Sequence, residues 1–146
     1  MKIVAFLLFA FSVIPAPGWV TRFDEAQTTA NDKHRLILLN FSGSDWCGPC
    51  IRLKKEIFES SLFEDFAASN LVLLNADFPR SNKNKLSKEQ VKQNEVLADK
   101  YNSKGRFPLT LLLNADGNIL KEWDGLPGTG PDGFVQQLKS LCDARK

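Results

Sequence analysis

Two cysteines separated by two residues are the groups in this sequence best suited to chemistry. They lie in the motif Trp46-Cys47-Gly48-Pro49-Cys50, and the residues that follow have a helical pattern. A Cys-x-x-Cys at the start of a helix brings two thiols close enough for a disulfide across one turn. The first thiol then lies at the helix N-terminus, where unpaired N–H groups and the helix dipole favour negative charge. We therefore expect the pKa of Cys47 to fall below the free value of about 8.5.

The residues between the cysteines suit the same arrangement. Pro49 fits the first helical turn because its missing N–H is not needed there, and Gly48 lets a partner backbone approach closely. We expect Cys47 to attack a partner disulfide, and Cys50, deeper and better shielded, to attack Cys47 and release the reduced partner. The same steps in reverse oxidise a dithiol, so the motif leaves the direction of electron flow open.

Other uses of Cys-x-x-Cys have less support. Haem attachment requires a His after the second cysteine, and Ile51 stands there. A structural zinc site generally needs four ligands, and beyond the motif the chain offers only Cys142 and His34. We expect no metal and no cofactor, an exposed His34 without a catalytic role, and a Cys142 that packs as a small hydrophobe beside Leu138 and Leu141. A purely structural disulfide stays open as an alternative, although so short a loop gains little from chain-entropy restriction.

The dithiol needs a strand before it and a helix after it, and the hydrophobic pattern predicts both. Continuous apolar runs indicate buried strands, and apolar spacings of three and four indicate amphipathic helices. Ser87 and Gln90 have the spacing of a capping box, which opens a helix. The predicted order is helix 23–32, strand 36–40, helix 47–60, strand 71–75, helix 87–101, strand 109–113, strand 119–123 and helix 131–144. Because strands separated by helices pair in parallel and the last hairpin adds an antiparallel edge, we expect an α/β fold: a mixed central sheet with helices on both faces.

Length and charge limit the other function classes. A chain of 146 residues suits one compact domain. The net charge is only +2, with basic and acidic residues interspersed. The densest basic stretch, 80–92, contains Glu89 and no aromatic residue that could stack on bases. We therefore expect no nucleic-acid partner.

The first residues have the layout of a secretory signal peptide. Lys2 precedes the apolar run 3–14, which only Ser12 interrupts. The small residues Ala16 and Gly18 then stand at the two positions that a signal peptidase reads. As a helix the run would rise about 18 Å, short of the ~30 Å hydrocarbon core of a bilayer. We predict a signal peptide at 1–18 and a mature domain at 19–146 that is periplasmic or secreted, with no stable membrane insertion after processing.

With these elements in place, the Cys-Gly-Pro-Cys motif between a buried strand and an amphipathic helix resembles the active-site motif of the thioredoxin-like family. A second landmark is Phe107-Pro108, directly before the third predicted strand. In thioredoxin-like proteins this proline is cis, faces the dithiol and helps to receive an extended substrate segment. The resemblance implies this substrate-binding role for Phe107 and Pro108, and active-site support by Trp46, Gly48 and Pro49. A trans proline that only opens the strand is the alternative.

The resemblance covers nearly all of 19–146 and favours the exported bacterial branch, which includes the C-terminal domain of periplasmic disulfide-interchange reductases. This chain departs from cytosolic thioredoxins at three positions. Their buried Asp and nearby Lys align with Asn40 and Leu73, and the usual Thr after the cis proline is Leu109. An uncharged Asn40 cannot deprotonate Cys50, so water or another group must do so.

The resemblance also bears on the direction of electron flow. A Gly-Pro pair between the cysteines resembles reducing thioredoxins, whose potentials lie near about −270 mV. We therefore expect an exported thiol–disulfide oxidoreductase that reduces disulfides in client proteins. A membrane thiol reductase would resupply its electrons, because the compartment is oxidising. The alternatives are a disulfide oxidase or isomerase with the same residues, or a thioredoxin-fold peptide-binding module without redox turnover.

Overall fold

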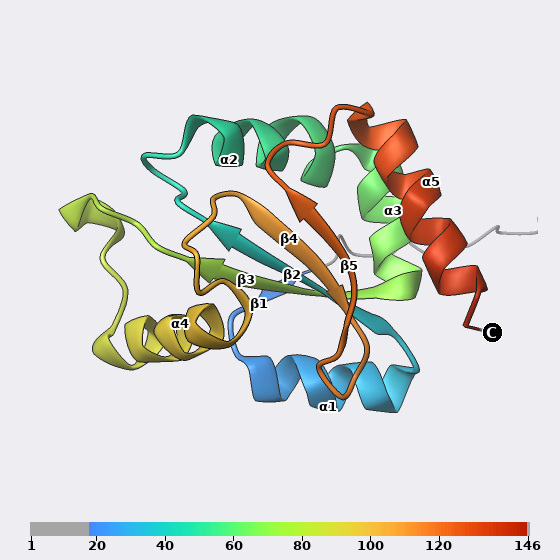
Figure 1. The fold of residues 1–146 in the computed structure, drawn as a ribbon, viewed down its shortest axis with the longest axis horizontal. Helices are drawn as coiled ribbons and strands as arrows, with labels where there is room; N and C mark the ends of the chain where they lie inside the picture. Colours follow the sequence, from blue (N-terminus) through green and yellow to red (C-terminus); the bar gives the residue numbers. More distant parts are fainter. Residues whose placement is uncertain (1–17, 146) are drawn as a thin grey trace, which may run out of the picture.

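A five-stranded mixed sheet forms the centre of the protein (Figure 1). The computed structural model describes residues 18–145, so the predicted signal peptide lies outside the described residues except for Gly18. The strand order is β1-β3-β2-β4-β5; β1, β3 and β2 run parallel, whereas β4 and β5 are antiparallel to their neighbours. The strands are β1 (Trp19–Val20), β2 (Leu36–Ser42), β3 (Leu71–Asp77), β4 (Leu109–Leu113) and β5 (Ile119–Asp124).

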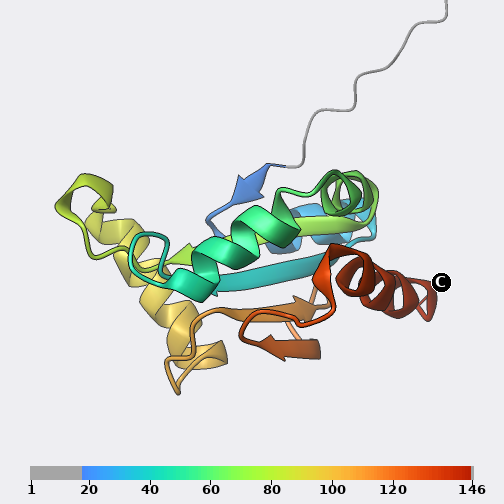
Figure 2. The same cartoon turned by 90° about the horizontal axis from the view of Figure 1, so that it is seen from above.

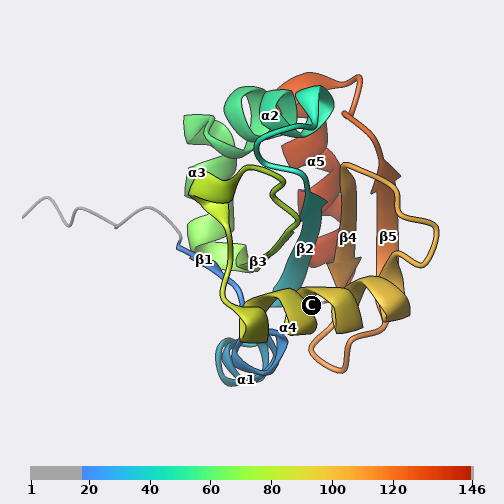
Figure 3. The same cartoon turned by 90° about the vertical axis from the view of Figure 1, so that its left-hand side faces the viewer.

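Helices cover both faces of this sheet, with α1 and α4 on one side and α2, α3 and α5 on the other (Figure 1 and Figure 3). A π-helical turn, Lys54–Phe58, continues α2, and a short 3₁₀ turn, Asn82–Asn84, precedes α4. Within the described residues, no helix is long and apolar enough to cross a membrane. The helices are α1 (Phe23–Lys33), α2 (Gly48–Leu53), α3 (Ser61–Asn70), α4 (Lys88–Tyr101) and α5 (Gly130–Asp143).

The predicted α/β class, the mixed sheet and every predicted element are confirmed, but the sequence pattern missed strand β1, helix α3 and the short 3₁₀ turn before α4. Strand β1 has only two residues, too few for a periodic signal. Helix α3 occupies the segment between the predicted helix 47–60 and the predicted strand 71–75, for which the sequence pattern predicted no element. Its N-cap is Ser60, whose hydroxyl accepts a hydrogen bond from Phe63 N (3.3 Å), and Phe63 and Ala67 are buried on its inner side. This N-cap followed by apolar residues is the signal that could have predicted α3.

Each face of the sheet has its own apolar cluster. Under α1 and α4, Ile37, Leu39 and Phe41 of β2 are fully buried. The opposite face holds packed aromatic rings from the π-helical turn, α3, β5 and α5, with centroid separations of 5.0 to 6.3 Å. Burial of these large side chains is the main stabilisation of the three-layer arrangement.

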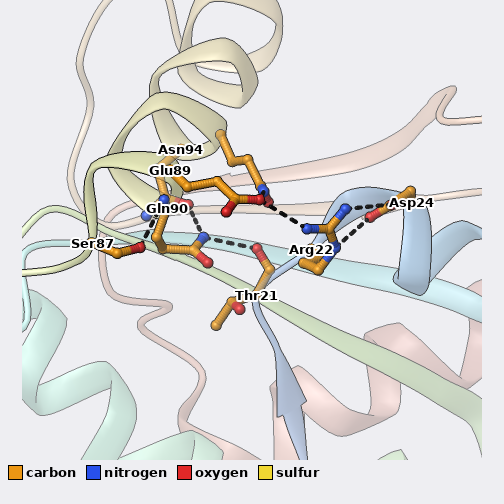
Figure 4. Close-up of polar contacts among 8 residues, drawn as sticks. Thr21, Arg22, Asp24, Ser87, Glu89, Gln90 and Asn94 are labelled. Atoms are coloured by element: carbon orange, nitrogen blue, oxygen red, sulfur yellow. Dashed lines mark hydrogen bonds and ion pairs between the residues drawn. The ribbon is translucent and has the colours of Figure 1, made fainter.

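Helix α4 is tied to the segment between β1 and α1. Ser87 caps the helix, accepting a hydrogen bond from Gln90 N (3.1 Å), so the predicted N-cap is confirmed. The Gln90 side chain does not complete a capping box. It donates instead to Thr21 O (3.0 Å) and to Asn94 Oδ1 (2.8 Å), as Figure 4 shows. Asn94 in turn donates to Asp77 O (2.8 Å), at the end of β3.

We predict that Asn94→Ala destabilises the domain. Asn94 is 1% exposed, and its loss removes the partner of the Asp77 carbonyl and of Gln90. An unpaired buried polar group costs about 1–3 kcal/mol, measurable as a lower free energy of unfolding in urea. The matched control is Glu95→Ala on the exposed side of α4, which should change stability by less than about 0.5 kcal/mol. Equal losses in the two variants would contradict the role of the buried amide.

Candidate active site

The two cysteines lie where β2 leads into α2. After Ser42 the chain turns tightly, with Trp46 N and Cys47 N both donating to Gly43 O (3.2 and 2.9 Å). Cys47 is the N-cap of α2, with extended backbone angles, and Cys50 N donates to its Sγ (3.3 Å). Pro49 lies in the first turn. The predicted position of Cys47 at a helix N-terminus is therefore confirmed, and the helical segment runs without a break through residue 58.

Cys47 and Cys50 form a disulfide in this structure, with their Cα atoms 5.2 Å apart. Their exposed fractions are 5% and 4%, so both cysteines are buried to nearly the same extent in this oxidised form. Better shielding of the Cys50 thiol stays a prediction for the reduced protein. The surroundings of the two cysteines do differ: Cys50 Sγ accepts a hydrogen bond from Gly43 N (3.5 Å) and lines a pocket, described below.

Aromatic rings form a wall beside the dithiol. The half-buried Trp46 ring packs on Gly43, where any Cβ would overlap it, and Trp46 Nε1 donates to Phe78 O (2.7 Å). The Phe107 ring meets both Trp46 and Phe78 edge-on, each at a centroid distance of 5.5 Å. The residue before Pro108 is thereby in contact with the residue before Cys47.

The Phe107–Pro108 peptide bond is cis, which confirms the predicted isomer. Pro108 is buried, and its carbonyl accepts a hydrogen bond from Gly125 N (2.9 Å). Leu109, which follows Pro108 and begins β4, pairs with Phe41, one residue before the end of β2. The cis proline therefore enters β4 at the edge of the sheet where the chain leaves for Cys47.

The loop after β3 is fastened to the same site, a feature that sequence reasoning missed. The Asp45 carboxylate accepts hydrogen bonds from Arg80 N, Ser81 N and Asn84 Nδ2 (2.9, 2.9 and 3.0 Å). These bonds, from Arg80 first and Asn84 second, lower the pKa of Asp45. The Arg80 guanidinium lies 3.8 Å from the Trp46 ring centroid, in a cation–π contact. Figure 2 shows this loop and α4 at the end of the sheet where α2 begins.

The remaining sequence candidates lie elsewhere. His34 is exposed at the C-terminal end of α1, as predicted, and its positive φ of 52° ends the helix. Cys142 packs against the apolar cluster as predicted but is half-buried, because it lies in the last turn of α5. Across residues 18–145, no three His, Cys, Asp or Glu side chains are grouped as metal ligands.

A dithiol at a helix N-terminus, a cis proline beside it and a mixed sheet between two helical layers define a thioredoxin-like protein. The thioredoxin-like domain family matches residues 23–140, and this chain belongs to that family. It is 35% identical over 123 residues to the disulfide bond reductase DsbH of Chlamydia pneumoniae, covering 84% of this chain and 72% of that protein. Together with the Cys47–Cys50 pair, this similarity shows that the protein is a thiol–disulfide oxidoreductase.

Solved structures agree with this assignment. A structure of a DsbH oxidoreductase has a TM-score of 0.80 and 30% identity, and the match covers 96% of this chain and 95% of that one. The oxidised C-terminal domain of DsbD from Neisseria meningitidis has a TM-score of 0.58 and 13% identity, covering 85% and 99% of the two chains. The latter similarity shows the fold alone.

We predict that Asp45→Ala releases the loop after β3. Without the carboxylate, the amides of Arg80 and Ser81 lose their acceptor, and their hydrogen exchange should accelerate about tenfold or more. The control Asp116→Ala, in the turn between β4 and β5, removes an exposed carboxylate and should leave these amides unchanged. Unchanged exchange at both amides in Asp45→Ala would contradict the proposed fastening.

The same contact has a predictable pH dependence in the unsubstituted protein. The pKa of Asp45 is lowered in the folded protein. The carboxylate therefore contributes its full stabilisation of the loop above its pKa in the unfolded chain, about 3.9, and loses it as the pH falls through its lower pKa in the folded protein. The loop should thus stay fixed at neutral pH and loosen only in acid.

Proposed function

We propose that this protein, once exported, reduces disulfides in client proteins through Cys47 and Cys50. Cys47 attacks a client disulfide and forms a mixed disulfide; Cys50 then attacks Cys47 Sγ, the client leaves as a thiol, and the protein is left oxidised. The observation that carries the proposal is the Cys47–Cys50 pair at the N-terminus of α2. The Gly-Pro pair between the cysteines and the similarity to a protein named a disulfide bond reductase support the reducing direction.

The surroundings of the pair support a surface for an extended client segment. Gly48 and Pro49 are exposed at the helix tip, and Ile51 is an exposed apolar side chain (45%) directly after Cys50. We assign Phe107 and Pro108 to client binding. Trp46, Gly48 and Pro49 support the site by shaping the approach to Cys47.

Export and resupply of electrons complete the proposal. The segment 1–18 has the composition of a signal peptide, which would deliver the domain to the periplasm or the medium. A reductase in such an oxidising compartment requires a donor, and we assign this role to a membrane thiol reductase. The clients are proteins with accessible disulfides.

The reduction potential tests the direction of electron flow. We predict a value for the Cys47–Cys50 couple near about −270 mV, as in reducing thioredoxins. It is measured by equilibrating the full mature domain with glutathione buffers and quantifying the thiols by alkylation. A value more positive than about −180 mV would instead place the protein with oxidases and isomerases.

Trapping tests the assigned roles of the two cysteines. Cys50→Ala should accumulate mixed disulfides with clients on Cys47, because the releasing attack is lost, whereas Cys47→Ala should trap none. Each variant is mixed with a model client protein that contains disulfides, and the mixed disulfides are detected on non-reducing gels. The matched control is Cys142→Ala on α5, which should turn over normally. Client binding that persists without either cysteine would favour the peptide-binding module.

A further inference from the structure

Side-chain alternation gathers polar groups on the sheet face beneath α2. Successive residues of a strand point to opposite faces, and Leu38 packs into the cluster on the α2 side. Asn40 and Ser42, two and four residues further on, therefore lie on the same face. The register of the parallel strands pairs Asn40 with Asn75 and Ser42 with Asp77. The face is thus apolar where the strands begin and polar where they end, next to the dithiol.

These polar groups are linked by hydrogen bonds. Asn40 Nδ2 donates to Asn75 Oδ1 (3.3 Å), and Thr110 Oγ1 donates to Asn40 Oδ1 (3.1 Å). Ser42 Oγ lies within hydrogen-bond distance of Asn75 Oδ1 (3.4 Å) and of Asp77 Oδ1 (3.1 Å). Asn40 is thereby satisfied as a neutral amide, and the series ends on the carboxylate of Asp77.

Cys50 and Asp77 line the same pocket. It has a volume of about 410 Å³, and Trp19 and Phe58 close its apolar side. The volume is ample for several water molecules among these polar walls. The pocket therefore connects the inner cysteine of the pair to a carboxylate through space that water fits.

Asp77 is the carboxylate of this pocket, and its position is fixed. Ser44 N (2.9 Å) and Ser44 Oγ both donate to it, in addition to Ser42 Oγ. The charged groups that face it are cations: Lys54 lines the same pocket, and Arg80 and Lys85 line a second hollow of about 290 Å³ on which Asp77 also borders. Lys54 is also 3.7 Å from Glu59, away from the pocket lining.

We propose that Asp77 accepts the proton of the Cys50 thiol, through water in this pocket, when Cys50 releases a client. The inference rests on the proposed function. The attacking species in disulfide exchange is the thiolate, and Asn40 and Ser42, the polar side chains on this face of β2, carry no charge. As the Cys50 proton passes through water to the Asp77 carboxylate, Cys50 Sγ bonds to Cys47 Sγ and the bond from Cys47 Sγ to the client sulfur breaks. The client leaves as a thiolate and takes a proton from water, and Asp77 returns its proton to solvent.

A two-phase reaction with an aromatic disulfide separates the two thiols. When reduced protein meets Ellman's reagent, attack by Cys47 releases the first coloured thiolate and attack by Cys50 on the mixed disulfide releases the second. In Asp77→Asn the second phase should slow by roughly 100-fold near pH 7, the lower end of the range for a general base. The first phase should keep its rate. At about pH 9.5, where the thiol ionises unaided, the deficit should close.

Closure of the deficit at high pH is the result that a merely structural role would not produce. The control Asp116→Asn removes a distant exposed carboxylate and should match the unsubstituted protein throughout. Asp77→Ser, which keeps a hydrogen-bonding group, should repeat the pH-dependent deficit if Asp77→Asn fails to fold. An unslowed second phase in either folded variant, or a deficit equal at both pH values, overturns the role of Asp77. Absence of the first phase in the unsubstituted protein would instead overturn the proposed function.

Discussion

The parallel register between β2 and β3 is the constraint on which the site depends, because it ends both strands at one edge of the sheet. Ser42 closes β2 and leads within five residues to Cys47, whereas Asp77 closes β3 beside it. The polar strand ends favour this register, since a slip of one residue would turn Asn40 or Asp77 to the face that the apolar cluster under α1 and α4 fills. The dithiol, the polar pocket and the loop held by Asp45 share one edge for this reason.

Polar groups are tolerated inside this part of the domain because they satisfy one another. The amide of Asn40 has partners on both neighbouring strands, Asn75 on β3 and Thr110 on β4. Among the buried side-chain polar atoms of the described residues, Arg106 Nε alone lacks a hydrogen-bond partner. Its guanidinium is otherwise engaged by Glu122 and Asp124 of β5. Burying such a network costs little folding free energy when every group has a partner, and much more when one member is lost.

The balance between oxidised and reduced forms is decided by what surrounds each sulfur. Cys50 N donates to Cys47 Sγ, and Gly43 N donates to Cys50 Sγ. Donors of this kind favour a thiolate over a thiol, and stabilisation of the reduced form makes a disulfide more oxidising. Of the two cysteines, only Cys50 lines the polar pocket. The backbone donors therefore face both sulfurs, whereas the pocket borders one of them.

Local chemistry was readable from the sequence. The cysteine spacing, the N-cap position of Cys47 and the cis peptide before Pro108 each depend on neighbours in the chain or on a recognisable motif. The tertiary structure alone decided the rest. Asp45 meets Arg80 across 35 residues of sequence, and Asp77 meets Ser44 across 33. No local pattern encodes these contacts, because they exist only once strand register and helix packing have brought the ends of β2 and β3 together.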